Sequence, residues 1–261
     1  MTHQIWTLEQ GDSPLVATAI HAGSQIRDEL VGYLAIDAEA RRREEDPYTD
    51  FWTQVAATRV VATASRFQVD LNRARDKAVY LSPIDAWGLD VWNQELPPQM
   101  IAHSLAEYDS FYRAMAKLFA ALSKKHGRFV VFDLHSYNHR RVGPDAPPAN
   151  AESNPQVNIG TGTMGNRSLF APVVECFIET FGTVEFPTGP LDIRENIKFR
   201  GGQFAKWIHS RYPDSACVLS IEFKKFYMDE WTGNADPLLL EAIRGALAST
   251  VLPVLETLEA L

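Results

Sequence analysis

The sequence predicts an α/β fold in which a mixed, mostly parallel central sheet is flanked by helices. Four short apolar runs rich in β-branched residues have the composition of inner strands, and segments with helical spacing separate them. The runs are 15–20, 60–64, 129–132 and 216–223. The helical pattern is clearest from Ile101 to Leu122, where apolar residues recur every three or four positions until Gly127 stops the helix.

Other elements follow from weaker patterns. Helices are expected at 29–43, 49–59, 169–181 and 237–261, and a turn or short strand is expected at 158–162. The polar, proline-rich stretch 143–155 is longer than a simple connection, which favours a lid or rim over a site. We expect a single domain over residues 1–261, because no Pro/Gly-rich linker divides the chain.

The amino-acid composition limits which binding partners and which cellular compartment are expected. A formal net charge of −8 argues against nucleic acid or an anionic membrane as the main partner, because both require a basic face. Cys176 and Cys217 are far apart and form no CxxC pattern, which suits a reducing compartment. With no signal-like segment and no long apolar stretch in the sequence, the expected location is the cytoplasm.

Polar residues follow the apolar runs at the points where strands are expected to end. His21 ends the first run, His135 follows the third and Glu222 lies late in the fourth, while the second continues toward Asp70. Because parallel strands present their carboxyl ends at one edge of a sheet, we expect these groups to meet there. A lone histidine at a strand end is more often structural, so the combination carries the argument.

This combination has the residue types of a catalytic zinc site. Such a site uses three protein ligands, commonly two histidines and a carboxylate, and leaves a position for water. A further carboxylate that does not bind the metal is needed as general base. His21 and His135 fit the first role and Glu222 fits the second.

Seven separated segments then resemble N-formylglutamate amidohydrolases in order and spacing, from about residue 15 to residue 230. These are HAG at 21–23, TDFW at 49–52, SRFQVDLNR at 65–73, DLHSY at 133–137, NIGT at 158–161, FRGG at 199–202 and IEFKKFYMDE at 221–230. More distantly, HSY at 135–137 and DLNR at 70–73 are similar to segments of zinc carboxypeptidases and aspartoacylases. The resemblance implies a zinc carboxypeptidase-like fold and one divalent metal ion, expected to be Zn²⁺, although iron, cobalt or manganese suit the same ligands.

The third metal ligand is the open point of the resemblance. Zinc carboxypeptidases take a histidine and a glutamate from one HxxE turn, but Ser24 stands at that position here. The resemblance favours Asp50, because the related amidohydrolases carry an aspartate in this segment, although Tyr48 replaces the first aspartate of their usual pattern. The rivals are Glu44, Glu45 and Asp46.

The resemblance also assigns the substrate side of the site. Arg73 is expected to clamp a substrate carboxylate, because a guanidinium matches a carboxylate with two parallel donors. Asn72 is expected to bind the same group, with Asp70 orienting Arg73 from behind. Asn158 and Arg200 are candidates for a second carboxylate or the acyl oxygen, as are Arg66 and Asn196.

The function expected from this resemblance is hydrolysis of N-formyl-L-glutamate to glutamate and formate. The expected partner is therefore a small molecule with a free carboxylate, and no oligomeric state is predicted. One alternative keeps the chemistry but changes the substrate, to another N-acyl amino acid or a carboxypeptidase-like substrate. Another alternative is a binding module that has lost activity, against which the presence of Glu222 argues, because a binder needs no base.

Overall fold

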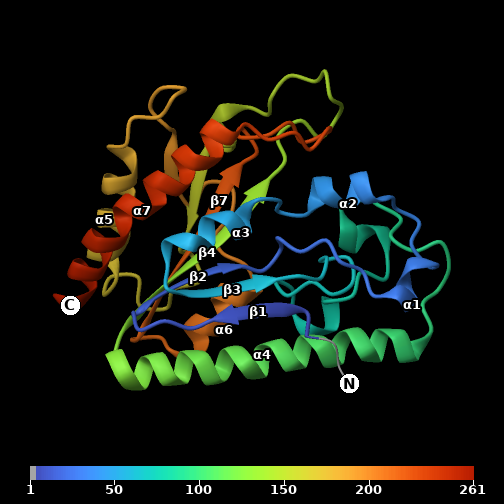
Figure 1. Ribbon diagram of the computed structural model, residues 1–261, viewed down its shortest axis with the longest axis horizontal. Helices are drawn as coiled ribbons and strands as arrows, with labels where there is room; N and C mark the ends of the chain where they lie inside the picture. The colour runs from blue at the N-terminus through green and yellow to red at the C-terminus, as the bar shows by residue number, and fades with distance from the viewer. Residues whose placement is uncertain (1–3) are drawn as a thin grey trace.

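The computed structural model describes residues 4–261, and a seven-stranded mixed sheet runs through the centre of these residues (Figure 1). The strand order is β1-β3-β2-β4-β7-β5-β6. The strands are β1 (Trp6–Glu9), β2 (Leu15–Ala19), β3 (Thr58–Ala62), β4 (Phe129–Tyr137), β5 (Val157–Gly160), β6 (Ile193–Glu195) and β7 (Ala216–Lys224). Strands β3, β2, β4 and β7 are mutually parallel, whereas β1 and β5 pair antiparallel with β3 and β7. The α/β fold with a mixed sheet is confirmed.

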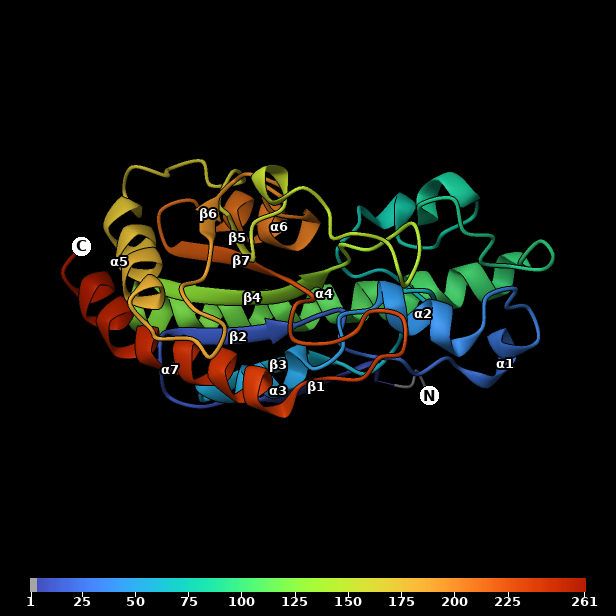
Figure 2. The same ribbon diagram turned by 90° about the horizontal axis from the view of Figure 1, so that it is seen from above.

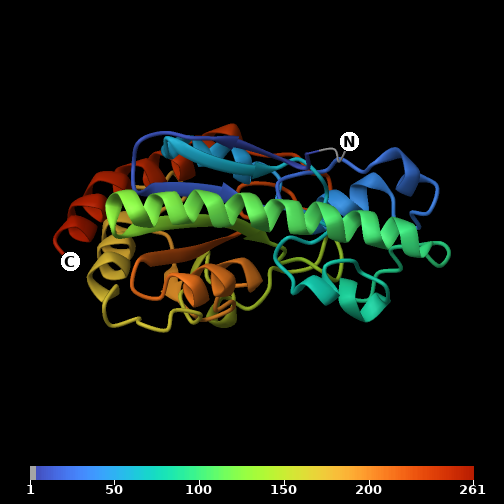
Figure 3. The ribbon, with the colours of Figure 1, turned by 90° about the horizontal axis from the view of Figure 1, so that it is seen from below.

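Helices cover both faces of this sheet, as the alternation of buried side chains along the inner strands requires. Val130 and Phe132 of β4 pack with one group of helices, and Phe129 and Val131 pack with the other. The first face carries α3 (Thr49–Trp52), α5 (Ala171–Gly182) and α7 (Pro237–Glu259), and the second carries α4 (Pro98–His126) and α6 (Gln203–Arg211). Figure 2 shows α7 in front of the strands, and Figure 3 shows α4 crossing the opposite face.

Two of the expected helices are broken into shorter pieces. The segment 29–43 contains α1 (Asp28–Val31) and α2 (Ala38–Glu44), because the chain between them pairs through the amide of Ala35 with the carbonyl of Val91. Asp37 starts α2 anew by accepting a hydrogen bond from the amide of Ala40. The segment 49–59 ends early, with α3 and the 3₁₀ turn η1 (Thr53–Val55) leading directly into β3.

Several elements lay outside the sequence predictions. β1 and β6 are short strands at the two edges of the sheet, and α6 directly follows the FRGG segment at 199–202. The remaining short elements are the 3₁₀ turns η2 (Arg75–Lys77), η3 (Pro83–Ala86) and η4 (Ala151–Ser153). Elements this short present too few residues for a periodic pattern to develop, so only tertiary contacts specify them.

The C-terminal helix α7 is the one helix of residues 4–261 that is long and apolar enough to cross a membrane. Core helices of globular proteins can have the same length and composition. Here Leu239, Ile243, Leu247 and Val254 lie buried on one side of α7, within the core that α5 and the sheet also form.

The contact between α6 and β7 contains a histidine that should make folding stability depend on pH. His209 is buried, its Nε2 accepts the amide of Val218 at 3.1 Å, and its Nδ1 therefore carries a proton and faces Thr163 Oγ1 at 2.8 Å. Burial lowers the pKa of His209 to about 4, from an ordinary value of 6.5. Below about pH 6.5, His209 is protonated in the unfolded chain but stays neutral in the folded chain. The free energy of unfolding therefore falls as the pH drops from 6.5 toward 4.

We expect protonation of His209 in the unfolded chain to lower the free energy of unfolding by about 2 kcal/mol at pH 5 relative to pH 7. Urea unfolding at both pH values, on the native protein and on His209→Gln, measures the contribution. Glutamine does not titrate, so its variant should lose about 2 kcal/mol less than the native protein between the two pH values. Equal losses in the two proteins would contradict the assignment.

Candidate active site

A polar cavity of about 320 Å³ lies at the carboxyl ends of β2, β4 and β7. It brings together His21, His135 and Glu222, as the arrangement of parallel strands predicts. Its acidic lining residues are Glu44, Asp46 and Glu222, and its basic ones are Arg43, Arg66, Arg73, Arg141, Arg200 and Lys225. The excess of guanidinium groups favours an anionic ligand.

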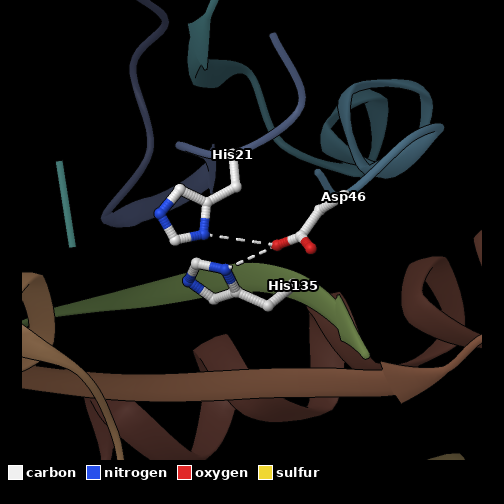
Figure 4. A group of neighbouring side chains, drawn as sticks. All are labelled: His21, Asp46 and His135. Carbon is white, nitrogen blue, oxygen red and sulfur yellow. Dashed lines mark hydrogen bonds and ion pairs between the residues drawn. The ribbon is translucent and has the colours of Figure 1, made fainter. Parts of the chain in front are cut away.

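At the base of the cavity, two histidines and one aspartate converge (Figure 4). Asp46 Oδ2 lies 2.9 Å from His135 Nδ1 and 3.5 Å from His21 Nδ1. All three residues are buried, and one donor atom from each lies within 4.8 Å of the others. His21 lies two residues beyond the end of β2 and His135 lies in β4, whereas Asp46 is on the loop that leads from α2 to α3.

The group contains Asp46, one of the rivals, where the resemblance favoured Asp50. Asp50 is exposed in the first turn of α3 and is not part of the group. Tyr48 turns the chain between the two aspartates with a left-handed φ of 70°, and its hydroxyl contacts the carbonyl of Gly233 away from the cavity. Ser24 is also exposed, so the turn after the first histidine contributes no ligand.

Two further aspartates lie behind the histidines and orient them. His21 Nε2 lies 2.7 Å from Asp70 Oδ1, and His135 Nε2 lies 3.2 Å from Asp133 Oδ2. Asp70 accepts a hydrogen bond from His21 Nε2, whereas Asp133 contacts His135 Nε2 as an ion pair without hydrogen-bond geometry. Nδ1 of each ring faces Asp46. Burial alone would raise the pKa of Asp70, but Arg66 and His21 outweigh it and hold that pKa well below its usual value.

The donor set fits a divalent cation. Two imidazole nitrogens and a carboxylate oxygen are the ligands of a catalytic zinc, and around such an ion ligand atoms lie about 3.3 Å apart. The separations of 2.9 and 3.5 Å from Asp46 are close to that spacing. Burial opposes a positive charge on His135, yet Asp133 and Asp46 raise its pKa well above the usual value. The electrostatic field of these carboxylates therefore favours a positive charge between the two imidazole rings. These three side chains could therefore hold a metal ion.

Glu222 sits beside this group without belonging to it. It is the register partner of His135 on the neighbouring parallel strand, so both side chains leave the sheet on the same face. Burial raises the pKa of Glu222 to about 8, and the nearby Asp46 and Asp133 oppose the attraction of His135. A carboxyl group of this kind exchanges protons near neutral pH, as a general acid and base must.

Among the described residues, the guanidinium groups of Arg73 and Arg200, which both line the cavity, donate no hydrogen bond to another residue. Arg73 is partly exposed, and its nearest carboxylate oxygen, Asp70 Oδ2, is 3.8 Å away. Arg200 is exposed and precedes Gly201, whose φ of 102° favours glycine. Gly202 packs so closely on the Asn72 side chain that a β-carbon would lie 2.3 Å from Asn72 Oδ1. These glycines therefore bring the Arg200 segment against the cavity wall.

Three residues that were predicted on the substrate side of the site, Asp70, Asn158 and Asn72, form hydrogen bonds with other protein groups. Asp70 is fully buried and binds His21 and Arg66, so it supports the first histidine more than Arg73. Asn158 is also fully buried, and its side chain binds the backbone of residues 198 and 199, which fixes the segment before Arg200. Asn72 does line the cavity, but its Oδ1 accepts the amide of Phe204 in the first turn of α6.

Sequence reasoning missed three residues of the site. Asp133 could have been found, because it precedes His135 by two positions and strand alternation places both on one face. Trp87 lines the cavity from a long irregular segment and lies over the guanidinium of Arg66, 4.7 Å from its carbon. Lys225 is a buried cation three residues beyond Glu222, and no sequence pattern distinguishes it from its neighbour Lys224.

Comparison with known proteins identifies the family. The chain superposes on the crystal structure of N-formylglutamate amidohydrolase from Ralstonia eutropha JMP134 with a TM-score of 0.73 and 19% identity, covering 99% of this chain and 98% of that one. A gene product from Agrobacterium tumefaciens gives a TM-score of 0.69 and 18% identity, with 98% and 97% covered. These likenesses establish the fold, and no curated protein matches the sequence. The family model of N-formylglutamate amidohydrolases matches residues 13–228, and the chain therefore belongs to that family.

Proposed function

We propose that the protein is a zinc-dependent amidohydrolase that converts N-formyl-L-glutamate and water to glutamate and formate. The observation that carries the proposal is the buried group of His21, Asp46 and His135 beside Glu222, in a cavity rich in guanidinium groups. Family membership supports an amidohydrolase, and the geometry supports the metal-assisted form of the reaction. A bound divalent ion would polarise the formyl oxygen and lower the pKa of water toward neutrality.

The protein side chains supply the remaining chemistry. Glu222 accepts a proton from the attacking water, whose oxygen forms a bond to the formyl carbon. The bond between that carbon and the glutamate nitrogen breaks, and Glu222 returns the proton to the leaving nitrogen. Asp70 and Asp133 keep His21 and His135 oriented throughout, because each carboxylate lies within ion-pair distance of the ring nitrogen that faces away from Asp46.

Arg73 and Arg200 suit a substrate with two carboxylates. Arg66 forms an ion pair with Asp70 and Arg141 forms one with Glu44, so fewer of their donors are free to bind a ligand. Arg73 has no such close partner and offers a planar fork of donors to the carboxylate next to the scissile amide. Arg200 would then take the side-chain carboxylate, which explains a preference for an acidic amino acid.

The test is turnover of N-formyl-L-glutamate beside a series of formyl, acetyl and longer N-acyl amino acids, with metal content measured on the same samples. Turnover confined to the formyl substrate supports the proposal. Faster turnover of another acyl compound would move the assignment to an N-acyl amino acid hydrolase of different preference. Bound metal without turnover of any amide would contradict the hydrolytic assignment.

Arg73→Ala is expected to raise KM for N-formyl-L-glutamate by about 10- to 100-fold, the usual cost of a lost charge-assisted hydrogen bond. Metal content should not change, because Arg73 is no ligand. Arg75→Ala is the matched control, since Arg75 is exposed on the same segment and pairs with Asp109 outside the cavity. N-formyl-4-aminobutyrate lacks the carboxylate next to the nitrogen, so its KM should be high in the native protein and unaffected by Arg73→Ala. An equal rise for both substrates would show that Arg73 acts otherwise.

A further inference from the structure

The third metal donor is held by loop backbone and not by a strand. Asp46 follows the C-terminal end of α2, and its amide donates to the carbonyl of His21 at 3.0 Å. Its own carbonyl accepts the hydroxyl of Thr49 at 2.7 Å. A ligand on a loop needs support from its surroundings if it is to meet the other two donors within a few tenths of an ångström.

Two cations, the buried Lys225 and the partly buried Arg66, bind the three carbonyls that directly precede Asp46. Lys225 Nζ donates to the carbonyl of Arg43 at 2.6 Å and to that of Glu45 at 2.9 Å. Arg66 Nη1 donates to the carbonyl between them, that of Glu44, at 3.2 Å. Lys225 is 1% exposed, so its ammonium group depends on these carbonyls for hydrogen bonds in place of water.

These contacts join the loop to the sheet. The last carbonyls of a helix have no partner within the helix, and cations near this end are favourable. Lys225 immediately follows β7 and is anchored there by its own amide, which donates to the carbonyl of Tyr137 at 3.0 Å. The strand that carries Glu222 thereby also fixes the position of the segment that carries Asp46.

We propose that Lys225 is a positioning residue for the metal site: it binds the backbone on both sides of Glu44 and so places the Asp46 carboxylate against His21 and His135. This role rests on the proposed metal-dependent function, because it concerns how tightly the three donors hold an ion. Lys225 does not touch the reacting atoms in this role, and its effect passes through Asp46.

The test is the zinc dissociation constant of Lys225→Met, measured by competition with a chromophoric chelator. Methionine fills much of the same volume but donates no hydrogen bond. We expect zinc to bind about 10- to 100-fold more weakly, as when other groups that support a metal ligand are removed. The visible absorption spectrum of the Co²⁺-loaded variant should also change, because it reports the ligand geometry. Lys224→Met is the control and should leave both unchanged, since Lys224 Nζ binds the carbonyl of Asn154 instead.

A second measurement separates positioning from general destabilisation. In an Asp46→Asn background, adding Lys225→Met should weaken zinc binding by less than threefold, because the donor that Lys225 places is already impaired. An equal loss in both backgrounds, or an unchanged dissociation constant for Lys225→Met alone, would overturn the proposal. If Lys225→Met does not fold, Lys225→Gln keeps one donor and should weaken binding by a smaller factor. Absence of zinc binding in the native protein would instead refute the proposed metal-dependent function.

Discussion

Asp46→Ala is expected to lose bound metal and hydrolytic activity together, whereas Asp50→Ala should keep both. Asp46 Oδ2 faces both histidines at 2.9 and 3.5 Å, and Asp50 is exposed on the first turn of α3. Removal of a residue that supports a ligand weakens metal binding about 10- to 100-fold, and removal of the ligand itself should weaken zinc binding by a larger factor. Elemental analysis after dialysis, with about one zinc per chain expected in the native protein, measures the difference.

His135→Ala provides the reference for complete disruption of the site. It should match Asp46→Ala in metal content, and a chelator should lower the melting temperature of the native protein but of neither variant, because only a protein that binds the ion is stabilised by it. Retention of zinc by Asp46→Ala together with its loss from Asp50→Ala would restore the assignment of Asp50. Since the two aspartates are four residues apart, the pair forms a closely matched comparison.

Glu222→Gln is expected to reduce kcat by about 10²- to 10⁴-fold, the range usually supplied by general acid and base catalysis. Glutamine preserves the shape of the side chain but cannot accept the proton of water. Metal content should stay near that of the native protein, because Glu222 lies outside the group formed by His21, Asp46 and His135. Single-turnover kinetics on the zinc-loaded variant measures the chemical step directly.

Glu179→Gln serves as control for this variant, because Glu179 is exposed on α5 and does not line the cavity. Its kcat should equal that of the native protein. Full turnover by zinc-loaded Glu222→Gln would remove Glu222 from the mechanism, and loss of zinc from that variant would place it among the ligands. Either result would require a different base.

The groups at strand ends were accessible from the sequence because a local pattern determines their position. An apolar run that ends in a histidine places that side chain at the carboxyl edge, and parallel neighbours bring His21, His135 and Glu222 to the same edge. The long helix α4 was similarly accessible, since its apolar spacing and the glycine after it are both local signals.

Asp46 could be proposed only as one of several acids, because its position depends on distant contacts. Glu44, Glu45 and Asp46 are all buried, and their carboxylates bind Arg141, Ser65 and the histidines respectively. No local signal in the sequence tells which of three consecutive acids faces the two histidines. Asp50, in turn, matched a family segment, but it follows the left-handed turn at Tyr48 and is exposed in the first turn of α3.

The three donors and Glu222 come from four segments spread between residues 21 and 222. No fragment that lacks β7 contains the whole constellation, and β7 is the last strand of the sheet in chain order. Contacts between residues so far apart in sequence form late in folding, after the cost of closing long loops has been met. A metal ion bound by these residues would therefore not guide the early collapse of the chain. It would act on the assembled sheet, where it would slow unfolding and leave the rate of folding unchanged.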